Sequence, residues 1–315
     1  MLNIKIAIIG NFDKTYIDLI KQQSDYEVEL YSKGDISTKD AEILVGIGFI
    51  NEYTASSIMN SKKIKWIHIL AAGVENLPFK EIKQKNIIVT NSTGIHGIPI
   101  SEHVFGMLLN FTRNLFMFQE QKKQKIWKQQ IGTELCGKTM GIVGLGSIGC
   151  EIARKAKAFD MKVIGIKKNK VPLENVDCVY ASEELQEVLL QSDFVVIALP
   201  STPLTKKLIS KKEFESMKDG AYFVNISRGQ IVDEASLIEA LKNGKLKGAC
   251  LDVFEEEPLS LDSEIWDIGN VIISPHLASL SPAYFDRAFK LFLYNLKQFE
   301  DKKELKNIID LDMEY

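Results

Sequence analysis

The sequence predicts an α/β protein that contains two doubly wound parallel sheets. Short apolar runs alternate with helical patterns along nearly the whole chain, as expected for parallel strands joined by crossover helices. One glycine-rich turn, Gly144–Gly149, lies between an apolar run and a helical pattern near the middle of the chain. At 315 residues the chain exceeds the usual size of one domain, so two domains are expected.

The composition argues against several classes of protein. A net charge of −3 gives no general reason to expect nucleic-acid or membrane partners. No apolar run approaches the ~20 residues that span a bilayer. The four cysteines are far apart and form no CxxC pair, which favours a reduced, cytoplasmic compartment with inert buried thiols and predicts no metal site. They are Cys136, Cys150, Cys178 and Cys250.

The first hundred residues predict a parallel sheet with helices on both faces. Strands are expected at Ile4–Ile9, Glu27–Tyr31, Ile43–Ile47, Trp66–Leu70 and Ile87–Val89. The loops Ala71–Asn76 and Asn91–Gly94 each follow a strand. Ligands bind at the carboxyl ends of strands in such sheets, but both loops are also compatible with ordinary turns.

An amphipathic helix is predicted to open at Pro99 and Ser101 and to run as far as Leu115, because apolar residues recur there with helical spacing. We expect it to cross between the two domains. The segment Gln119–Gln130 is too charged for a core. We interpret it as a solvated arm around Trp127, with subunit contact as the alternative.

The alternation of apolar runs and helical patterns predicts six strands in the second domain, enough for a complete dinucleotide-binding sheet. The strands are Met140–Val143, Val163–Ile166, Phe194–Leu199, Tyr222–Ile226, Ala249–Val253 and Val271–Ile273, and the helices are Ser147–Phe159, Glu184–Leu190, Lys211–Met217 and Asp233–Asn243. A last helical pattern follows Pro282 and is expected to pack on the first domain. The predicted domains are therefore 1–100 with 281–315, and 101–280.

The glycine-rich turn predicts a dinucleotide site because it follows a strand and opens a helix. Gly144 allows the tight turn, Gly146 lets the backbone approach a pyrophosphate, and Gly149 lets the helix pack on the strand. The backbone N–H groups near Ser147 and Ile148 favour an anion at the helix N-terminus.

Two lysines stand where a Rossmann domain selects its cofactor. An acidic residue there would bind the ribose hydroxyls of NAD, but the second strand ends at Ile166 and Lys167 and Lys168 follow. Lysines would neutralise a 2′-phosphate, so we predict a preference for NADP(H), with NAD(H) as the alternative. Exposed lysines are common in this chain, and that weakens the inference.

An arginine, carboxylates and a histidine follow successive predicted strands, at Arg228, Glu255–Glu257 and His276. Together they suit hydride transfer to a keto acid. A protonated histidine can give its proton to the carbonyl oxygen, a carboxylate can orient it, and an arginine can bind the substrate carboxylate with two bonds. Each also has a simpler reading: a structural histidine, a solvated acidic turn and a structural ion pair.

In combination these motifs identify a family. The chain resembles the D-isomer-specific 2-hydroxyacid dehydrogenases, and the resemblance covers nearly all of it. The motifs that carry it are Ala72-Gly73-Val74, Thr90–Gly94, Ser101-Glu102-His103, Gly144–Gly149, Leu199–Pro203, Met217-Lys218, Asn225–Gly229, Leu251–Phe254, Glu257-Pro258 and Pro275-His276.

The resemblance implies a Rossmann cofactor domain inserted in a flavodoxin-like substrate domain. It also implies reversible, NAD(P)-dependent reduction of a 2-keto acid to a D-2-hydroxy acid. Arg228 would bind the substrate carboxylate. Glu257, which directly precedes a proline as in the family pattern, would pair with His276, the proton donor.

Further roles are implied for residues around this centre. The backbone at Ala72, Gly73 and Val74 would hold the substrate carboxylate from the other domain. Asp252 would contact the nicotinamide amide, Ser227 would lie close to the ring, and Pro200 belongs to a turn at the cofactor. Family members generally form dimers, so a homodimer is expected. Lys167 and Lys168 depart from the acid that many members carry.

Two other functions are compatible with parts of the pattern. Corepressors of the same superfamily bind a dinucleotide and recruit partners, so a dinucleotide-sensing interaction protein is the alternative. A different Rossmann enzyme, such as a hydrolase with bound NAD, explains the glycines but not the Arg, Glu, His order.

The substrate stays open among glyoxylate, hydroxypyruvate, phosphohydroxypyruvate, pyruvate and bulkier 2-keto acids. Loop residues near Asn51, Ala72–Asn76 and Tyr284 are expected to select it.

Overall fold

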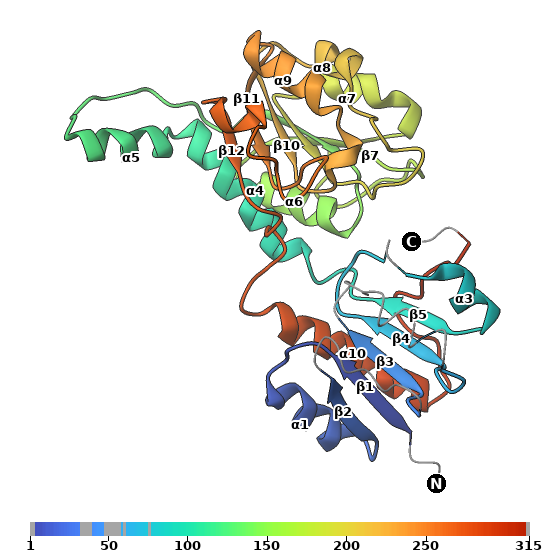
Figure 1. Cartoon of the computed structure of the whole chain (residues 1–315). Coiled ribbons are helices and arrows are strands. Elements are labelled where there is room, and N and C mark those ends of the chain that lie inside the picture. The colour runs from blue at the N-terminus through green and yellow to red at the C-terminus, as the bar shows by residue number, and fades with distance from the viewer. Residues whose placement is uncertain (1–3, 32–39, 47–57, 59–60, 75–76, 313–315) are drawn as a thin grey trace. The chain divides into compact units, whose positions relative to one another are not determined.

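The computed structural model divides the chain into two compact units. Residues 1–95 and 281–315 form one, which we call the split unit, and residues 96–280 form the other, the central unit. The structure describes residues 4–31, 40–46, 58, 61–74 and 77–312, and the descriptions below concern these (Figure 1).

The split unit contains a five-stranded parallel sheet with the order β2-β1-β3-β4-β5. The strands are β1 (Lys5–Ile9), β2 (Glu27–Tyr31), β3 (Ile43–Gly46), β4 (Trp66–Ile69) and β5 (Ile88–Asn91). This is the strand order of flavodoxin-like folds, so the predicted architecture of this part is confirmed.

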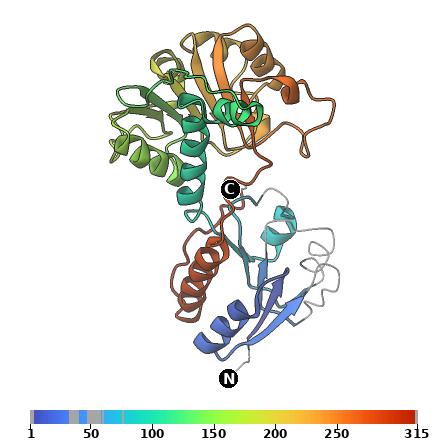
Figure 2. The same ribbon diagram turned by 90° about the vertical axis from the view of Figure 1, so that its left-hand side faces the viewer.

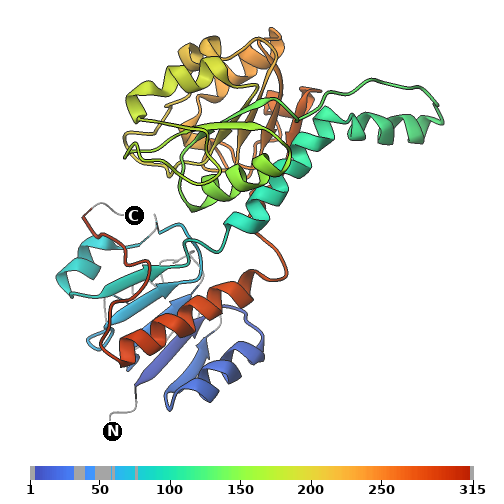
Figure 3. The ribbon, with the colours of Figure 1, turned by 180° about the vertical axis from the view of Figure 1, so that it is seen from behind.

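Helices cover both faces of this sheet. They are α1 (Lys14–Gln23), α3 (Phe79–Gln84) and α10 (Tyr284–Glu300). On one face Ile6 and Ile8 of β1 pack with Phe289 and Phe292 of α10, and Figure 3 shows α10 lying along this sheet. On the other face Ile82 of α3 packs against alternate strand residues. The last helix therefore returns to the first sheet, as predicted.

A buried histidine lies inside the split unit. His68 in β4 is fully buried, and its Nδ1 lies 2.7 Å from the Thr90 hydroxyl. Trp66 donates its indole N–H to the same hydroxyl at 2.8 Å, so Thr90 gives its own hydrogen to a neutral imidazole. Burial lowers the pKa of His68 to about 3.

This histidine should make the split unit sensitive to acid. Its pKa is about 6.5 in the unfolded chain, so its contribution to stability is complete above that pH and is lost as the pH falls towards the folded value. Replacement of His68 by asparagine, which keeps an acceptor for Thr90, should flatten the dependence of the unfolding free energy on pH. Urea unfolding between pH 7 and pH 4.5 measures this. An unchanged dependence would contradict the assignment.

The central unit contains a seven-stranded parallel sheet with the order β12-β11-β10-β9-β6-β7-β8, which is a Rossmann order with one added edge strand. Its strands are β6 (Thr139–Val143), β7 (Lys162–Ile166), β8 (Cys178–Tyr180), β9 (Phe194–Ile197), β10 (Ala221–Asn225), β11 (Leu246–Leu251) and β12 (Val271–Ile273). The prediction of six strands was wrong because β8 is only three residues long and carries no clear pattern.

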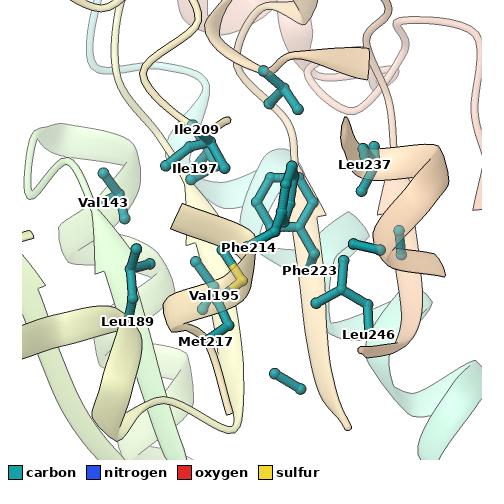
Figure 4. Packing of buried hydrophobic residues seen from close by; sticks show 14 of the residues in the cluster. Val143, Leu189, Val195, Ile197, Ile209, Phe214, Met217, Phe223, Leu237 and Leu246 are labelled. Atoms are coloured by element: carbon teal, nitrogen blue, oxygen red, sulfur yellow. The ribbon is translucent and has the colours of Figure 1, made fainter. Parts of the chain in front are cut away.

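Helices pack on both faces of the second sheet. They are α4 (Gly97–Thr112), α6 (Ser147–Ala158), α7 (Leu185–Gln191), α8 (Lys211–Ser216) and α9 (Glu234–Lys242). The helices α4 and α6 lie side by side on one face (Figures 1 and 2). On the other face Phe214 of α8 meets Phe223 of β10 edge-on, with ring centroids 5.3 Å apart (Figure 4).

The amphipathic helix predicted to reach Leu115 is in fact two helices. The first, α4, ends at Thr112, and Asn114 then adopts a left-handed conformation with φ 56°. A second helix, α5 (Leu115–Gln124), follows and has no buried side chain. Figures 1 and 3 show α5 projecting away from the sheet of the central unit. Trp127, just beyond it, is 98% exposed.

The cysteines are only partly as predicted. Among the described residues all four are free thiols, and Cys250 is buried, which raises the pKa of its thiol. The expectation that all are buried was wrong: Cys136 is exposed because it lies in the turn before β6, and Cys150 and Cys178 are partly exposed. A separate finding concerns membranes: none of the described helices has the length and apolar character needed to cross one.

Candidate active site

The glycine-rich turn between β6 and α6 has the shape of a phosphate cradle. Gly144 has a φ of +114°, and a Cβ there would lie 2.5 Å from the Ala198 carbonyl oxygen. A Cβ on Gly149 would lie 2.1 Å from the Gly144 oxygen, so the helix packs directly on the turn. A Cβ on Gly146 would meet nothing within 4 Å, which leaves room for a ligand. The N-terminus of α6 is thus open to an anion.

One of the lysines after β7 reaches this turn. Lys167 donates from Nζ to the Leu145 carbonyl oxygen at 2.8 Å, so its ammonium reaches the glycine-rich turn. Lys168 is exposed. Lys170 pairs instead with Glu184 at 2.8 Å. One of these ammonium groups, that of Lys167, is therefore held at the glycine-rich turn.

The loops after β9 and β10 are tied together. Ser227 is buried and donates from Oγ to the Leu199 carbonyl, directly before the exposed Pro200. Asn225 donates from Nδ2 to the Arg228 carbonyl at 3.1 Å, and Arg228 donates from Nη1 to the Ser227 carbonyl at 2.9 Å. The backbone that carries the arginine is therefore fixed by its own loop.

Arg228, Asp252 and His276 follow three neighbouring strands, β10, β11 and β12. The loops of the first two strands touch closely, because a Cβ on Gly229 would lie 1.8 Å from the Phe254 carbonyl carbon. The sheet therefore places these three predicted site residues along one edge of the central unit.

His276 and Glu257 form a direct pair. The His276 Nδ1 lies 2.7 Å from Glu257 Oε2, and Glu257 Oε1 accepts the Phe254 backbone N–H at 3.0 Å. With Nδ1–H donated to the carboxylate, Nε2 is left for proton exchange. Both side chains are partly exposed, at 46% and 35%. His276 has a left-handed φ of 49°, an uncommon conformation that clusters at functional sites.

Asp252 is buried and holds the backbone beyond His276. Its Oδ1 accepts the Ser274 hydroxyl at 2.6 Å and the Leu277 N–H at 3.0 Å, and its Oδ2 accepts the Ala278 N–H at 2.9 Å. Its carbonyl oxygen also accepts the His276 N–H at 2.8 Å. Asp252 thus fixes the segment that carries the histidine.

A second histidine of this region was not among the predicted site residues. His96 is buried directly before α4, and burial and the positive charge of Arg228 lower its pKa to about 4. It is therefore neutral near pH 7 and lies within electrostatic reach of the arginine. A signal existed, because the chain has only four histidines and this one precedes a helix start.

In the split unit the loop after β4 is held by its carbonyl groups. The Leu70 oxygen accepts the Tyr284 hydroxyl at 2.7 Å, the Ala71 oxygen accepts the Ser92 N–H at 2.9 Å, and the Ala72 oxygen accepts Asn91 Nδ2 at 2.7 Å. Because N–H and C=O point in opposite directions across a peptide, the next N–H groups face away from these donors. Such a row of N–H groups can bind an anion.

Of the residues expected to select the substrate, Tyr284 is described by the structure and several others are not. Tyr284 is buried, and its hydroxyl supports the loop after β4. Asn51, Glu75 and Asn76 lie outside the described residues. Within the described part of the chain, no group of three or more His, Cys, Asp or Glu side chains is arranged to hold a metal ion.

Comparison with known proteins gives consistent results. The family model for the NAD-binding domain of D-isomer specific 2-hydroxyacid dehydrogenases matches residues 105–278. A glyoxylate reductase from Thermococcus litoralis is 31% identical over 98% of this chain and 97% of its own length. A D-3-phosphoglycerate dehydrogenase from Methanocaldococcus jannaschii is 34% identical over 87% of this chain, which spans only 53% of that relative.

Solved structures show the same similarity. A D-isomer specific 2-hydroxyacid dehydrogenase family protein from Aeromonas salmonicida has a TM-score of 0.87 and 32% identity, over 98% of this chain and 100% of that one. A D-isomer specific 2-hydroxyacid dehydrogenase from Xanthobacter autotrophicus, in complex with NADPH and MES, has a TM-score of 0.84 and 25% identity over 99% and 100%.

Proposed function

Because the chain belongs to the D-isomer-specific 2-hydroxyacid dehydrogenase family, we propose that it reduces a 2-keto acid to the D-2-hydroxy acid, and catalyses the reverse reaction. The observation that carries this proposal is the 2.7 Å pair of His276 Nδ1 with Glu257, which leaves Nε2 for a substrate proton. Its position along the same sheet edge as Arg228 supports it.

Each residue has a distinct role in this proposal. A bound nicotinamide supplies the hydride that reaches C2 of the substrate. His276 gives its proton from Nε2 to the carbonyl oxygen in reduction and removes it in oxidation. Glu257 holds the imidazole in orientation through its contact with Nδ1. Arg228 binds the substrate carboxylate and polarises the neighbouring carbonyl.

The loop after β4 of the split unit is proposed to offer backbone donors to a substrate carboxylate. The N–H groups at Ala72 and Gly73 face away from the donors that hold the Leu70, Ala71 and Ala72 carbonyls. Val74 is buried and anchors the loop in the core of the split unit. The backbone at 72–74 therefore offers donors without an added side-chain charge.

The cofactor is proposed to be NADP(H) rather than NAD(H). In the glycine turn Gly144 and Gly149 are tightly packed, whereas Gly146 faces open space at the N-terminus of α6, where the N–H groups near Ser147 and Ile148 would meet a pyrophosphate. Pro200, Ser227 and Asp252 would lie towards the nicotinamide. Lys167 beside Leu145, and the exposed Lys168, would meet the 2′-phosphate. The Xanthobacter relative was solved with NADPH.

Replacement of Lys168 by alanine should raise the KM for NADPH about tenfold and leave the KM for NADH nearly unchanged, because one charge-assisted contact to phosphate is lost. Steady-state kinetics with both cofactors measure this. Lys212→Ala on α8 is the matched control, since it removes an exposed lysine elsewhere in the central unit. A clear NADH preference of the wild-type chain would contradict the assignment.

The activity itself is tested by NADPH oxidation over a panel of 2-keto acids that includes glyoxylate, hydroxypyruvate, phosphohydroxypyruvate, pyruvate and bulkier examples, repeated with NADH. We expect turnover with at least one of them and formation of the D-enantiomer. Binding of NADPH without turnover of any member would favour a dinucleotide-sensing role instead.

A homodimer is proposed on the exposure of apolar side chains around α5. Phe116 is 62% exposed, Trp127 98% and Ile131 99%, and such side chains are typical of a surface that a second copy covers. Sedimentation velocity tests this: the wild type should be a dimer and Trp127→Asp should shift it towards monomer. A wild-type monomer at micromolar concentration would refute it.

A cytoplasmic location is proposed on the cysteines, which are dispersed and all free. Fractionation of cells that express the chain, followed by immunoblotting, tests this, and recovery with the membrane fraction would contradict it.

A further inference from the structure

We propose that His103 is a positioning residue of the active site and that it acts through Ser274 on Asp252. This inference rests on the proposed function, because Asp252 is the residue expected to meet the nicotinamide amide. None of the roles assigned above involves His103, which enters only as part of the Ser101-Glu102-His103 motif.

The geometry is a short chain of hydrogen bonds within the central unit. His103 Nε2 lies 2.8 Å from Ser274 Oγ, and Ser274 Oγ lies 2.6 Å from Asp252 Oδ1. His103 Nε2 itself is 3.8 Å from Asp252 Oδ1, so the serine forms the bridge. The Asp252 side chain is 3% exposed and that of His103 is 22% exposed. The bridge is therefore largely shielded from water.

The two hydrogen bonds of this bridge can have only one donor-to-acceptor direction. The carboxylate of Asp252 accepts backbone N–H groups at both oxygens and has no hydrogen to give. The Ser274 hydroxyl must then donate to Asp252, which leaves the serine oxygen as an acceptor. His103 has to fill that position with Nε2–H. The bridge therefore selects one imidazole tautomer.

The position of Asp252 matters for two other parts of the site. Its carboxylate holds the Leu277 and Ala278 N–H groups, and its carbonyl oxygen accepts the N–H of His276. That last bond helps to hold His276 in its left-handed conformation. A change in the orientation of Asp252 should therefore be felt at both the cofactor and the proton donor.

His103 is itself anchored by α4. The adjacent Val104 is fully buried against the core that α4 shares with α6. At the start of α4, Lys155 of α6 donates to the Ile98 carbonyl at 3.2 Å. The helix α6 also begins at the glycine turn. Because α4 packs on α6 and carries His103, it connects the glycine turn to the Asp252 bridge.

Replacement of His103 by leucine should lower kcat/KM at least about tenfold and raise the Kd of NADPH, because the bridge loses its donor. Glutamine places an N–H where Nε2 was, so His103→Gln should stay near wild type. The Kd is measured from NADPH fluorescence without substrate. Glu102→Gln, in the same turn of α4, removes only the pair with Lys155 and should leave both values unchanged.

Ser274→Ala should reproduce the loss, and the His103→Leu, Ser274→Ala double variant should lose no more than either single variant. Additive losses, a glutamine variant as poor as leucine, or a leucine variant equal to wild type would overturn the proposal. Absence of turnover in the wild type would instead count against the proposed function, and the NADPH titration would still test the bridge.

The tautomer gives a readout without cofactor. Since the chain has only four histidines, ¹⁵N-detected imidazole spectra can be assigned by substitution. We expect His103 as the Nε2–H tautomer in the wild type and a changed signal in Ser274→Ala. An Nδ1–H tautomer in the wild type would refute the bridge.

Discussion

His276→Gln is expected to lower kcat for keto-acid reduction roughly 1,000-fold. Glutamine approximates the size and polarity of the imidazole but cannot carry a transferable proton near neutral pH. The hydride would then have to reach C2 without a proton donor at the carbonyl oxygen. The glycine turn, the lysines and Asp252 are unchanged, so NADPH should bind with nearly wild-type affinity. Single-turnover kinetics and NADPH fluorescence separate the two effects.

The three consecutive glutamates provide a matched control. Glu257 contacts His276, whereas the adjacent Glu256 is exposed. Glu257→Gln should therefore lower kcat, but less than His276→Gln, because the imidazole keeps its place and loses only its charged partner. Glu256→Gln should leave kcat unchanged. If His276→Gln retains turnover, another group donates the proton and the mechanism is wrong.

The fold was largely predictable because parallel strands are buried on both faces and appear as short apolar runs. The exceptions are places where tertiary context decides. The strand Cys178–Tyr180 is recognisable only from its pairing with β7. The break after Thr112 depends on Asn114, whose left-handed conformation does not interrupt the apolar periodicity of the helix.

Parts of the candidate site were predictable for a different reason. Arg228, Glu257 and His276 carry distinctive chemistry after strands, and the strand order brings their loops to one edge. The contacts that hold them were not predictable, because they join distant residues. His103 and Ser274 are 171 residues apart in sequence. The same is true of Tyr284, whose hydroxyl supports the loop after β4 across 214 residues.

The second large effect is expected for Arg228→Lys, which should lower kcat/KM for the keto acid about 100-fold while the Kd of NADPH stays near wild type. Lysine keeps the positive charge but loses the planar pair of donors that fits a carboxylate. It also loses the Nη1 bond to the Ser227 carbonyl, which orients the guanidinium. Most of the loss should fall on substrate binding and on the polarised carbonyl, since neither proton donor nor cofactor site changes.

Only four of the 39 basic residues of the chain are arginines, and one of the others provides a control for this substitution. Arg154 on α6 also binds a carboxylate with two bonds, to Glu151 at 2.9 and 2.7 Å, but on an exposed surface. Arg154→Lys makes the same chemical change away from the proposed chemistry and should leave kcat/KM unchanged. Equal losses in both variants would mean that Arg228 acts only through stability. A large loss at Arg228 alone would show that the planar donor itself recognises the substrate.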